Sequence, residues 1–489
     1  MAFHSAGEGN QEENGRQNGN HEDVTVVMVP LPAQGHLNLF LHLARYVSSY
    51  NVPVHYVCSP AHSRQVQSRI HGWDHKDDDD DLHGCSRNRI TFHEFGVPSY
   101  ETPPPNPNNR TKYPVQLLPA FYASLHLREP ISQLLQKLSN KTRRLVVIHD
   151  ALIPYVVQDI CSIPNGESYS FLSTSAFYTY SVYWELEGKP ESLPESQLLQ
   201  LLPKDTYPPE AIAYMLSQLE VKINSSGTLF HSCRAIDGPY LDHLTKLNTF
   251  TKKYWAVGPL NPITGGLRKY EEEQKPRHHC LEWLDKQAPN SVVFVSFGTT
   301  TSLSDQEIKV IAVGLEESNQ KFLWVLRDAD TGHLFNQKDR SLEDKLPQGF
   351  ETRMNRRGII VRDWAPQSDI LAHSSTGGFL SHCGWGSCME SISRGVPMAL
   401  WPMHSDHPTN SVLMTQVLKV GLLVVDWSPA HGNVTPKAIQ NAVRRLMDSS
   451  EGDAMRQRAQ EVSKTVKESI AAGGGRPLEM DSFVAHIRR

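Results

Sequence analysis

Residues 24–57 read VTVVMVPLPAQGHLNLFLHLARYVSSYNVPVHYV. Val24–Val29 is a nearly continuous apolar run, which is typical of a parallel strand buried on both faces. The loop 30–35 follows, and Val52–Val57 is the next strand-like run. Between them, apolar side chains recur at helical spacing, at Leu37, Leu41, Ala44 and Val47. This strand–helix–strand order predicts a doubly wound α/β sheet, which binds ligands at the carboxyl ends of its strands.

The same rhythm continues along the chain. In the first half, Arg144–Ile148 is another strand-like run, and it ends at His149-Asp150. A second series begins at Ser291–Ser296 and continues with helix Asp305–Ser318, strands Lys321–Leu326, Gly358–Val361 and Gly378–Ser381, and helix Ser387–Arg394. Because 489 residues are too many for one ordinary core, we expect two Rossmann-like domains that face a cleft.

Composition excludes several classes of protein. The chain has 48 Lys and Arg against 53 Asp and Glu, so its charge gives no reason to expect a nucleic-acid partner. The polar N-terminus has no apolar signal region, and no apolar run approaches the ~20 residues that span a bilayer. Seven scattered cysteines fit a reducing compartment. We therefore expect a cytoplasmic monomer without stable membrane insertion.

Residues 364–407 read WAPQSDILAHSSTGGFLSHCGWGSCMESISRGVPMALWPMHSDH. Trp364 follows a predicted strand and has a flat face that can stack on a base. The turn 383–386 leads into a helix whose first N–H groups can bind phosphate, with His382 as a further donor. Glu390 and Asp406 can accept hydrogen bonds from sugar hydroxyls. Taken singly, each has an ordinary structural alternative, such as a half-buried Trp or a solvated Glu.

In this order, the residues resemble the signature box of the plant UDP-dependent glycosyltransferases, which have the GT-B fold. The likeness also includes Pro-Ala-Gln-Gly-His at 32–36, Cys-Leu-Glu-Trp-Leu-Asp at 280–285 and Val-Ser-Phe-Gly-Thr at 295–299. Within that family, the chain resembles the zeatin O-glucosyltransferases and O-xylosyltransferases. The resemblance implies a UDP-sugar as co-substrate, with no other cofactor and no metal.

It also implies a division of the chain. We expect a disordered tail over 1–22, an N-terminal acceptor-binding domain over 23–255 and a linker over 256–277. A C-terminal UDP-sugar-binding domain then covers 278–465. The last segment, 466–489, is expected to be a helix that packs back on the N-terminal domain.

The resemblance further implies the residues of the donor site. It assigns Trp364 to uracil, Ala365 and Gln367 to base and ribose, Glu390 to ribose, His382 and Ser387 to the diphosphate, and Trp385 and Asp406 to the sugar. The loops that follow two predicted strands add Gly35, Gly298 and Thr299.

Two positions of the box depart from the family pattern. Gly386 stands where the family commonly has Asn, so an amide that assists the phosphates is missing, at a cost of ~1 kcal/mol unless water replaces it. His407 stands where the family commonly has Gln, which goes with glucose, whereas His sometimes goes with galactose or arabinose. These two residues therefore bear on donor affinity and on the identity of the sugar.

The acceptor must lose a proton as it attacks the sugar, and a histidine suits that task. His36 follows the first strand, and Asp150 ends another strand of the same predicted sheet, so both are expected at one edge. A carboxylate behind the ring would orient it and stabilise the imidazolium. By resemblance, His36 is the base and Asp150 its partner, in a single displacement that inverts the anomeric centre.

Two clusters have the composition of metal sites. Adjacent side chains in a strand or helix are expected to point apart, so we interpret His278-His279-Cys280 as linker or surface. Asp77–Asp81 is interpreted as a solvated loop.

The acceptor is expected to be small, and hydrophobic or planar and hydroxylated. An aromatic-rich stretch can line its pocket or belong to the core, at Phe171, Phe177, Tyr178, Tyr180, Tyr183 and Trp184, and we assign about half of these to core. The resemblance favours UDP-glucose and a cytokinin hydroxyl. A flavonoid or phenolic O- or C-glycosyltransferase that uses UDP-xylose or UDP-galactose is the alternative within enzymes, and a non-catalytic sugar-nucleotide binder is the alternative outside them.

Overall fold

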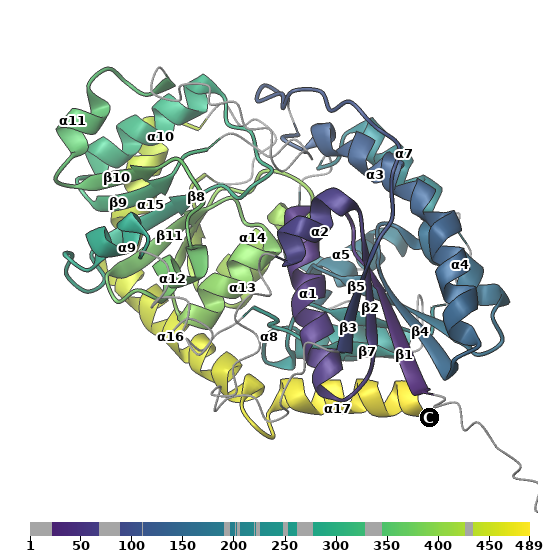
Figure 1. Cartoon of the computed structure of the whole chain (residues 1–489). Helices are drawn as coiled ribbons and strands as arrows, with labels where there is room; N and C mark the ends of the chain where they lie inside the picture. Colours follow the sequence, from purple (N-terminus) through teal and green to yellow (C-terminus); the bar gives the residue numbers. More distant parts are fainter. Residues whose placement is uncertain are drawn as a thin grey trace, which may run out of the picture.

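Two parallel β-sheets form the two halves of the protein, as seen in a computed structural model (Figure 1). The structure describes residues 22–489 except 68–88, 110, 190–195, 201, 203–205, 220, 222–224, 248–252, 262–276, 328–344 and 426–433. Within these residues, the N-terminal sheet has seven strands in the order β3-β2-β1-β4-β5-β6-β7, and the C-terminal sheet has six in the order β10-β9-β8-β11-β12-β13. The predicted α/β fold with two Rossmann-like halves is confirmed.

The N-terminal sheet contains β1 (Glu22–Val29), β2 (Val54–Cys58), β3 (Ile90–Glu94), β4 (Thr142–Asp150), β5 (Gly166–Leu172), β6 (Gly227–Phe230) and β7 (Tyr254–Ala256). The helices of this half are α1 (Gln34–Ser49), α2 (Pro60–Gln67), α3 (Leu118–Ser124), α4 (Arg128–Ser139), α5 (Ala176–Leu186), α6 (Ser196–Leu199), α7 (Pro209–Leu219) and α8 (Arg234–Leu247). Short 3-10 segments cover η2 (Val115–Leu117), η3 (Leu125–Leu127) and η4 (Pro154–Ser162).

The C-terminal sheet contains β8 (Val292–Ser296), β9 (Lys321–Val325), β10 (Gly358–Val361), β11 (Thr376–Ser381), β12 (Met398–Leu400) and β13 (Gly421–Leu423). Its helices are α9 (His279–Leu284), α10 (Asp305–Ser318), α11 (Phe350–Met354), α12 (Gln367–Ala372), α13 (Trp385–Arg394), α14 (His407–Val412), α15 (Pro436–Met447) and α16 (Ser450–Ile470), with a π-helical segment η7 (Leu413–Val417). The last helix of the chain is α17 (Gly475–Arg488).

Each sheet is buried on both faces because its strands send apolar side chains in both directions. In β1, Val26 and Met28 belong to the core under α1 and α17, whereas Val27 and Val29 belong to the core under α4 and η4. In β8, alternate side chains likewise reach separate cores, one under α13 and one under α10 and α15. The strand-like apolar runs in the sequence follow from this double burial.

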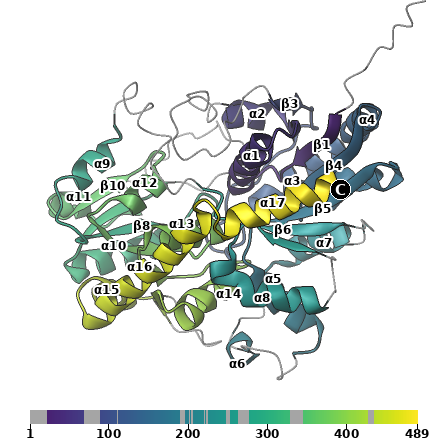
Figure 2. The same ribbon diagram turned by 90° about the horizontal axis from the view of Figure 1, so that it is seen from below.

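The last two helices connect the halves. α16 packs against α13 of the C-terminal half, and α17 then crosses below the N-terminal sheet (Figure 2). Phe483 of α17 lies edge-on to Tyr169 and to Trp255, each with ring centroids 5.3 Å apart. The chain therefore returns to its first half at its end.

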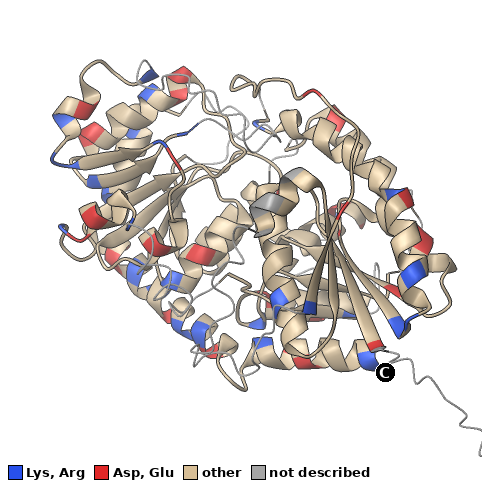
Figure 3. Ribbon diagram, viewed as in Figure 1, with Lys and Arg blue, Asp and Glu red and all other residues tan. Residues whose placement is uncertain are grey.

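Some predictions fall on residues that the structure does not describe. Residues 1–21 of the predicted tail, most of the linker and Asp77–Asp81 lie outside the described residues, whereas Glu22 begins β1. The domain boundaries, the monomeric state and the cytoplasmic location stay predictions. Among the described helices, none is both long enough and apolar enough to cross a membrane. Basic and acidic residues are intermixed over the outer helices of both halves (Figure 3).

Candidate active site

An imidazole–carboxylate pair lies at the carboxyl edge of the N-terminal sheet. β1 pairs with β4 in parallel, with Val29 beside His149, so the chain leaves both strands at the same edge. His36 stands in the first turn of α1, and its Nδ1 lies 2.6 Å from Oδ2 of Asp150 at the end of β4. The other oxygen of Asp150 accepts from the backbone N–H of Leu152 at 3.0 Å. The structure therefore brings together the two residues that the sequence placed at one edge.

Charge prepares this pair for proton transfer. Burial lowers the pKa of His36, but the charge of Asp150, its hydrogen bond and the charge of Asp406 outweigh burial and raise the pKa above its usual value. The side chain of His36 is 24% exposed, whereas that of Asp150 is 2% exposed. A partly accessible ring with a buried carboxylate behind it can accept a proton from a bound hydroxyl.

His382 is held in the other half between two glycines. It follows β11, whose Ser381 lies beside Ser296 of β8, and Gly298 is in the loop after β8. A Cβ at Gly298 would lie 2.5 Å from Nε2 of His382, and one at Gly384 would lie 2.6 Å from it. Gly298 also has a φ of +75°. Burial lowers the pKa of His382 to about 4, so its ring is neutral and can offer one N–H.

A hydrogen-bond network joins the predicted ribose and phosphate residues. Nε2 of Gln367, at the start of α12, donates to Oγ of Ser387 at 3.1 Å and to Oε2 of Glu390 at 2.8 Å. Oε1 of Glu390 accepts from the side-chain amide of Asn261 at 2.9 Å. Ala365 and Trp364 lie in the loop between β10 and α12, and Trp364 is 54% exposed. The structure thus gathers the predicted nucleotide residues at the carboxyl ends of β10 and β11.

Asp406 faces the His36–Asp150 pair across the two halves. It lies in the loop between β12 and α14, and it is close enough to contribute to the raised pKa of His36. Burial raises the pKa of Asp406 itself to about 6, although Asn410 donates to its Oδ2 at 2.7 Å. The backbone N–H of Ser405 donates to the carbonyl of Thr206 at 3.3 Å. One carboxylate of the C-terminal half is therefore positioned close to the His36–Asp150 pair of the N-terminal half.

His407 belongs to a cluster of buried neutral histidines. Its ring lies 4.2 Å from that of His404 and 5.0 Å from that of His382, measured between centroids. Its Nδ1 accepts from the backbone N–H of His404 at 3.3 Å, which leaves the proton on Nε2. Burial lowers the pKa of His407 well below its usual value. His407 therefore acts as a hydrogen-bond donor rather than as a charge.

Trp385, which is predicted to contact the sugar, is the first residue of α13. Its side chain is only 3% exposed, and its indole N–H donates to the carbonyl of His231 at 2.7 Å. The indole N–H is therefore already used, and Trp385 can offer the backbone N–H at the first residue of α13, so its contact with the sugar stays a prediction. Next to it, a Cβ at Gly386 would meet nothing within 4 Å. A Cβ at Gly35, beside His36, would likewise meet nothing within 4 Å.

Three tyrosines beside Asp406 form a group of which the sequence marked only Tyr178. The hydroxyls of Tyr178 and Tyr207 are 2.7 Å apart, and the ring of Tyr113 lies 5.7 Å from that of Tyr207. The pKa of Tyr178 is raised to about 12, mainly by burial and further by the charge of Asp406. Tyr113 and Tyr207 stand outside periodic segments, so nothing in the sequence pattern marked them.

The aromatic stretch around α5 belongs to the core more fully than predicted. Five of its six members are buried, at Phe171, Phe177, Tyr180, Tyr183 and Trp184. The four residues of α5 pack under α8 in the core that also reaches α13, whereas Phe171 of β5 belongs to the core under α1. Of this stretch, only Tyr178 remains near the site.

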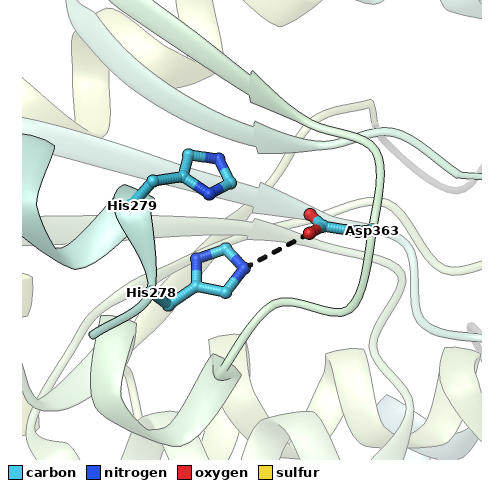
Figure 4. Close-up of side chains that lie close together, drawn as sticks. All are labelled: His278, His279 and Asp363. Atoms are coloured by element: carbon cyan, nitrogen blue, oxygen red, sulfur yellow. Dashed lines mark ion pairs between the residues drawn. The ribbon is translucent and has the colours of Figure 1, made fainter. Parts of the chain in front are cut away.

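The pair His278 and His279 also differs from its interpretation. Their rings stack with centroids 4.4 Å apart, and both lie near the carboxylate of Asp363 (Figure 4). His278 precedes α9 in extended backbone, with φ −62° and ψ 130°, and His279 is the first helical residue. The expectation that the two side chains point apart is wrong because the backbone changes conformation between them.

Known proteins resemble the chain along almost its whole length. Residues 22–262 match the family profile of a glycosyltransferase N-terminal domain, and residues 251–460 match that of UDP-glucoronosyl and UDP-glucosyl transferases. A zeatin O-glucosyltransferase of Phaseolus lunatus is 46% identical over 95% of this chain and 97% of its own. A zeatin O-xylosyltransferase of Phaseolus vulgaris is 45% identical over 95% of this chain and 98% of its own. The crystal structure of a ugt transferase from Siraitia grosvenorii in complex with UDP matches with a TM-score of 0.72 at 25% identity, over 96% of this chain and all of that one.

Proposed function

The chain belongs to the family of UDP-glucoronosyl and UDP-glucosyl transferases, and we propose that this member transfers glucose from UDP-glucose to the side-chain hydroxyl of a zeatin-type cytokinin. Two observations support the acceptor. The zeatin O-glucosyltransferase and O-xylosyltransferase of Phaseolus match nearly the full chain at 46% and 45% identity. The aromatic side chains of Tyr113, Tyr178 and Tyr207 offer a surface for a planar ring beside the base.

His36 carries the proton transfer. With Nδ1 bonded to Asp150 at 2.6 Å, its Nε2 has the lone pair that can take a proton from the acceptor hydroxyl. The acceptor oxygen then forms a bond to the anomeric carbon while the bond from that carbon to the UDP oxygen breaks. Because attack and departure occur on opposite faces, the configuration inverts. The His36–Asp150 contact is the single observation on which this assignment depends most.

The C-terminal half holds the leaving group. In this proposal, Trp364 and Ala365 take the base, and Gln367 and Glu390 take the ribose. The N–H groups that begin α13, the hydroxyl of Ser387, the ring of His382 and the loop 298–299 take the diphosphate. Preorganised N–H donors suit this task because they stabilise the negative charge that develops on UDP. No covalent intermediate is needed.

Asp406 and His407 define the sugar pocket. In this proposal, the carboxylate of Asp406 accepts from two sugar hydroxyls, and the Nε2–H of His407 donates to the sugar. UDP-glucose is the proposed donor, and UDP-xylose and UDP-galactose are the alternatives, because His407 replaces the common Gln of the family.

A donor–acceptor matrix tests the proposal. UDP-glucose, UDP-xylose and UDP-galactose are supplied singly with trans-zeatin, cis-zeatin or a flavonol, and products are identified by mass and by the anomeric proton coupling. We expect a β-linked O-glucoside of a zeatin. If a flavonoid product formed and no zeatin product did, the acceptor would be a flavonoid and the assignment to zeatin would be wrong. Absence of UDP release with every pair would favour a sugar-nucleotide binder.

A further inference from the structure

Two imidazoles and a carboxylate converge outside the reaction centre. His278 caps the N-terminus of α9, His279 begins that helix, and Asp363 follows β10 (Figure 4). Nε2 of His278 lies 3.7 Å from Oδ2 of Asp363, and the three potential ligand atoms all lie within 4.8 Å of one another. Two separate segments of the C-terminal half therefore present three metal-ligand groups to one point.

The contact with Asp363 does not satisfy His278. Its Nε2 atom is buried and has no hydrogen-bond partner in the described structure. A separation of 3.7 Å is longer than an N–H···O hydrogen bond, which spans roughly 2.7–3.2 Å. A buried polar atom without a partner is uncommon, and an ion is one of the reasons for it.

We propose that His278, His279 and Asp363 bind a divalent cation of the zinc class. Two imidazole nitrogens and one carboxylate oxygen are a ligand set that such ions accept, with water in the fourth position. In a tetrahedral site with bonds of about 2.0–2.2 Å, ligand atoms stand roughly 3.4 Å apart, so the three groups draw together by about 1 Å. His279 and Asp363 are exposed and can make that adjustment by rotating their side chains.

The surroundings of His278 fit a ligand role. Its Nδ1 lies 2.9 Å from Sγ of the buried Cys280. Nδ1 also accepts from the backbone N–H of Cys280 at 3.3 Å, so in the free site the ring proton resides on Nε2. A cation at Nε2 displaces that proton to Nδ1, which then donates to the sulfur in place of accepting from Cys280. A ligand histidine commonly donates its other N–H to a neighbouring acceptor, which fixes the orientation of the ring.

The position of the site suggests what the cation does. Asp363 directly precedes Trp364, the proposed stacking partner of uracil. A cation held there ties the start of α9 to the loop between β10 and α12. The cation therefore fixes the position of Trp364 without touching the reacting atoms. Its binding does not depend on which acceptor the enzyme uses.

Calorimetric titration with Zn²⁺ tests the site in the full chain, stripped of metal and without a histidine tag. We expect saturable binding that weakens at least about tenfold in His279→Ala and in Asp363→Ala. Both side chains are exposed, and a thermal melt checks that the variants fold. Co²⁺ added to the unsubstituted protein is expected to give the visible absorption of a four-coordinate ion, and both variants are expected to lose it.

The matched control is His373→Ala. Nε2 of His373 lies 3.0 Å from Asp285 in an ion pair that contains no second histidine, so its loss should leave Zn²⁺ affinity unchanged. The histidines and aspartates of residues 71–83 can also bind metal. Binding that persists in both cluster variants, or no saturable binding at all, would overturn the proposal.

Discussion

The pH dependence of the reaction is set by one pair of side chains. Only neutral His36 accepts a proton, so activity falls as the pH drops through its raised pKa. In Asp150→Asn, the two influences of Asp150 that raise this pKa disappear and burial, which lowers it, remains. The acid limb of kcat/KM should therefore move to lower pH.

The rate of Asp150→Asn should also fall by about 10²–10⁴, because an Asn amide donates to Nδ1 and leaves the proton on Nε2. A pH–rate profile measures both effects. Asp159→Asn is the control, since Asp159 pairs with Arg128 at 2.8 Å away from the site. An acid limb that stays in place in Asp150→Asn would contradict the role given to Asp150.

Gly298 is expected to tolerate no side chain. In Gly298→Ala, the new Cβ would press on His382 at 2.5 Å, in a backbone conformation that costs an L-residue about 1–2 kcal/mol. We expect a donor KM raised about tenfold or more with UDP-glucose. Gly386→Ala is the matched control because its Cβ meets nothing within 4 Å. Equal donor KM values for the two variants would contradict the proposed packing around His382.

At Gly386, in contrast to Gly298, an added side chain is expected to strengthen donor binding. The space beside it can accommodate an amide side chain at the start of α13. If that amide reaches the diphosphate, Gly386→Asn should bind UDP more tightly by about 1 kcal/mol, or roughly fivefold. Calorimetry with UDP measures the change, and weaker binding would show that the family's Asn does not fit this backbone.

Among the elements, α17 anchors the end of the chain to the N-terminal sheet. Phe483 is fully buried between Tyr169 and Trp255, so Phe483→Ala should lower the free energy of unfolding by about 3–5 kcal/mol. Leu478→Ala on the same helix is the control, because Leu478 is 59% exposed. Urea unfolding compares the two, and similar losses would show that α17 is not held by this contact.

The sequence predicts these elements well where one physical cause dominates. Strands such as β1 and β8 appear as apolar runs because both faces of each sheet are buried. His36 and Asp150 can be placed at one edge because parallel strands end together. The order of residues in the 364–407 box predicts which half binds the nucleotide without any knowledge of the contacts.

Other features depend on contacts that no local pattern records. The indole of Trp385 is occupied by a carbonyl from the other half, His231. Tyr113 and Tyr207 meet Tyr178 only after three distant segments fold together. His278 and His279 stack because the helix begins between them. Each of these contacts can be predicted only from the tertiary structure, because spacing along the chain does not show it.

At the scale of the whole molecule, the two halves meet around the reacting atoms. Lys112 of the N-terminal half lies 2.6 Å from Glu307 of α10, and Gln116 donates to the carbonyl of Thr300 at 3.3 Å. The apolar core of α5 and α8 continues into that of α13. These contacts join the half that carries His36 and Asp150 to the half that carries the 364–407 segment.

Because proton transfer and donor binding are assigned to different halves, one substitution tests the role of His36 most directly. In His36→Ala, the donor half is untouched, so UDP should bind with unchanged affinity in calorimetry. Turnover of UDP-glucose with trans-zeatin should fall by about 10²–10⁴, while His126→Ala, at an exposed histidine, keeps full activity. If folded His36→Ala retained near-normal turnover, His36 would not be the base, and the central claim would be wrong.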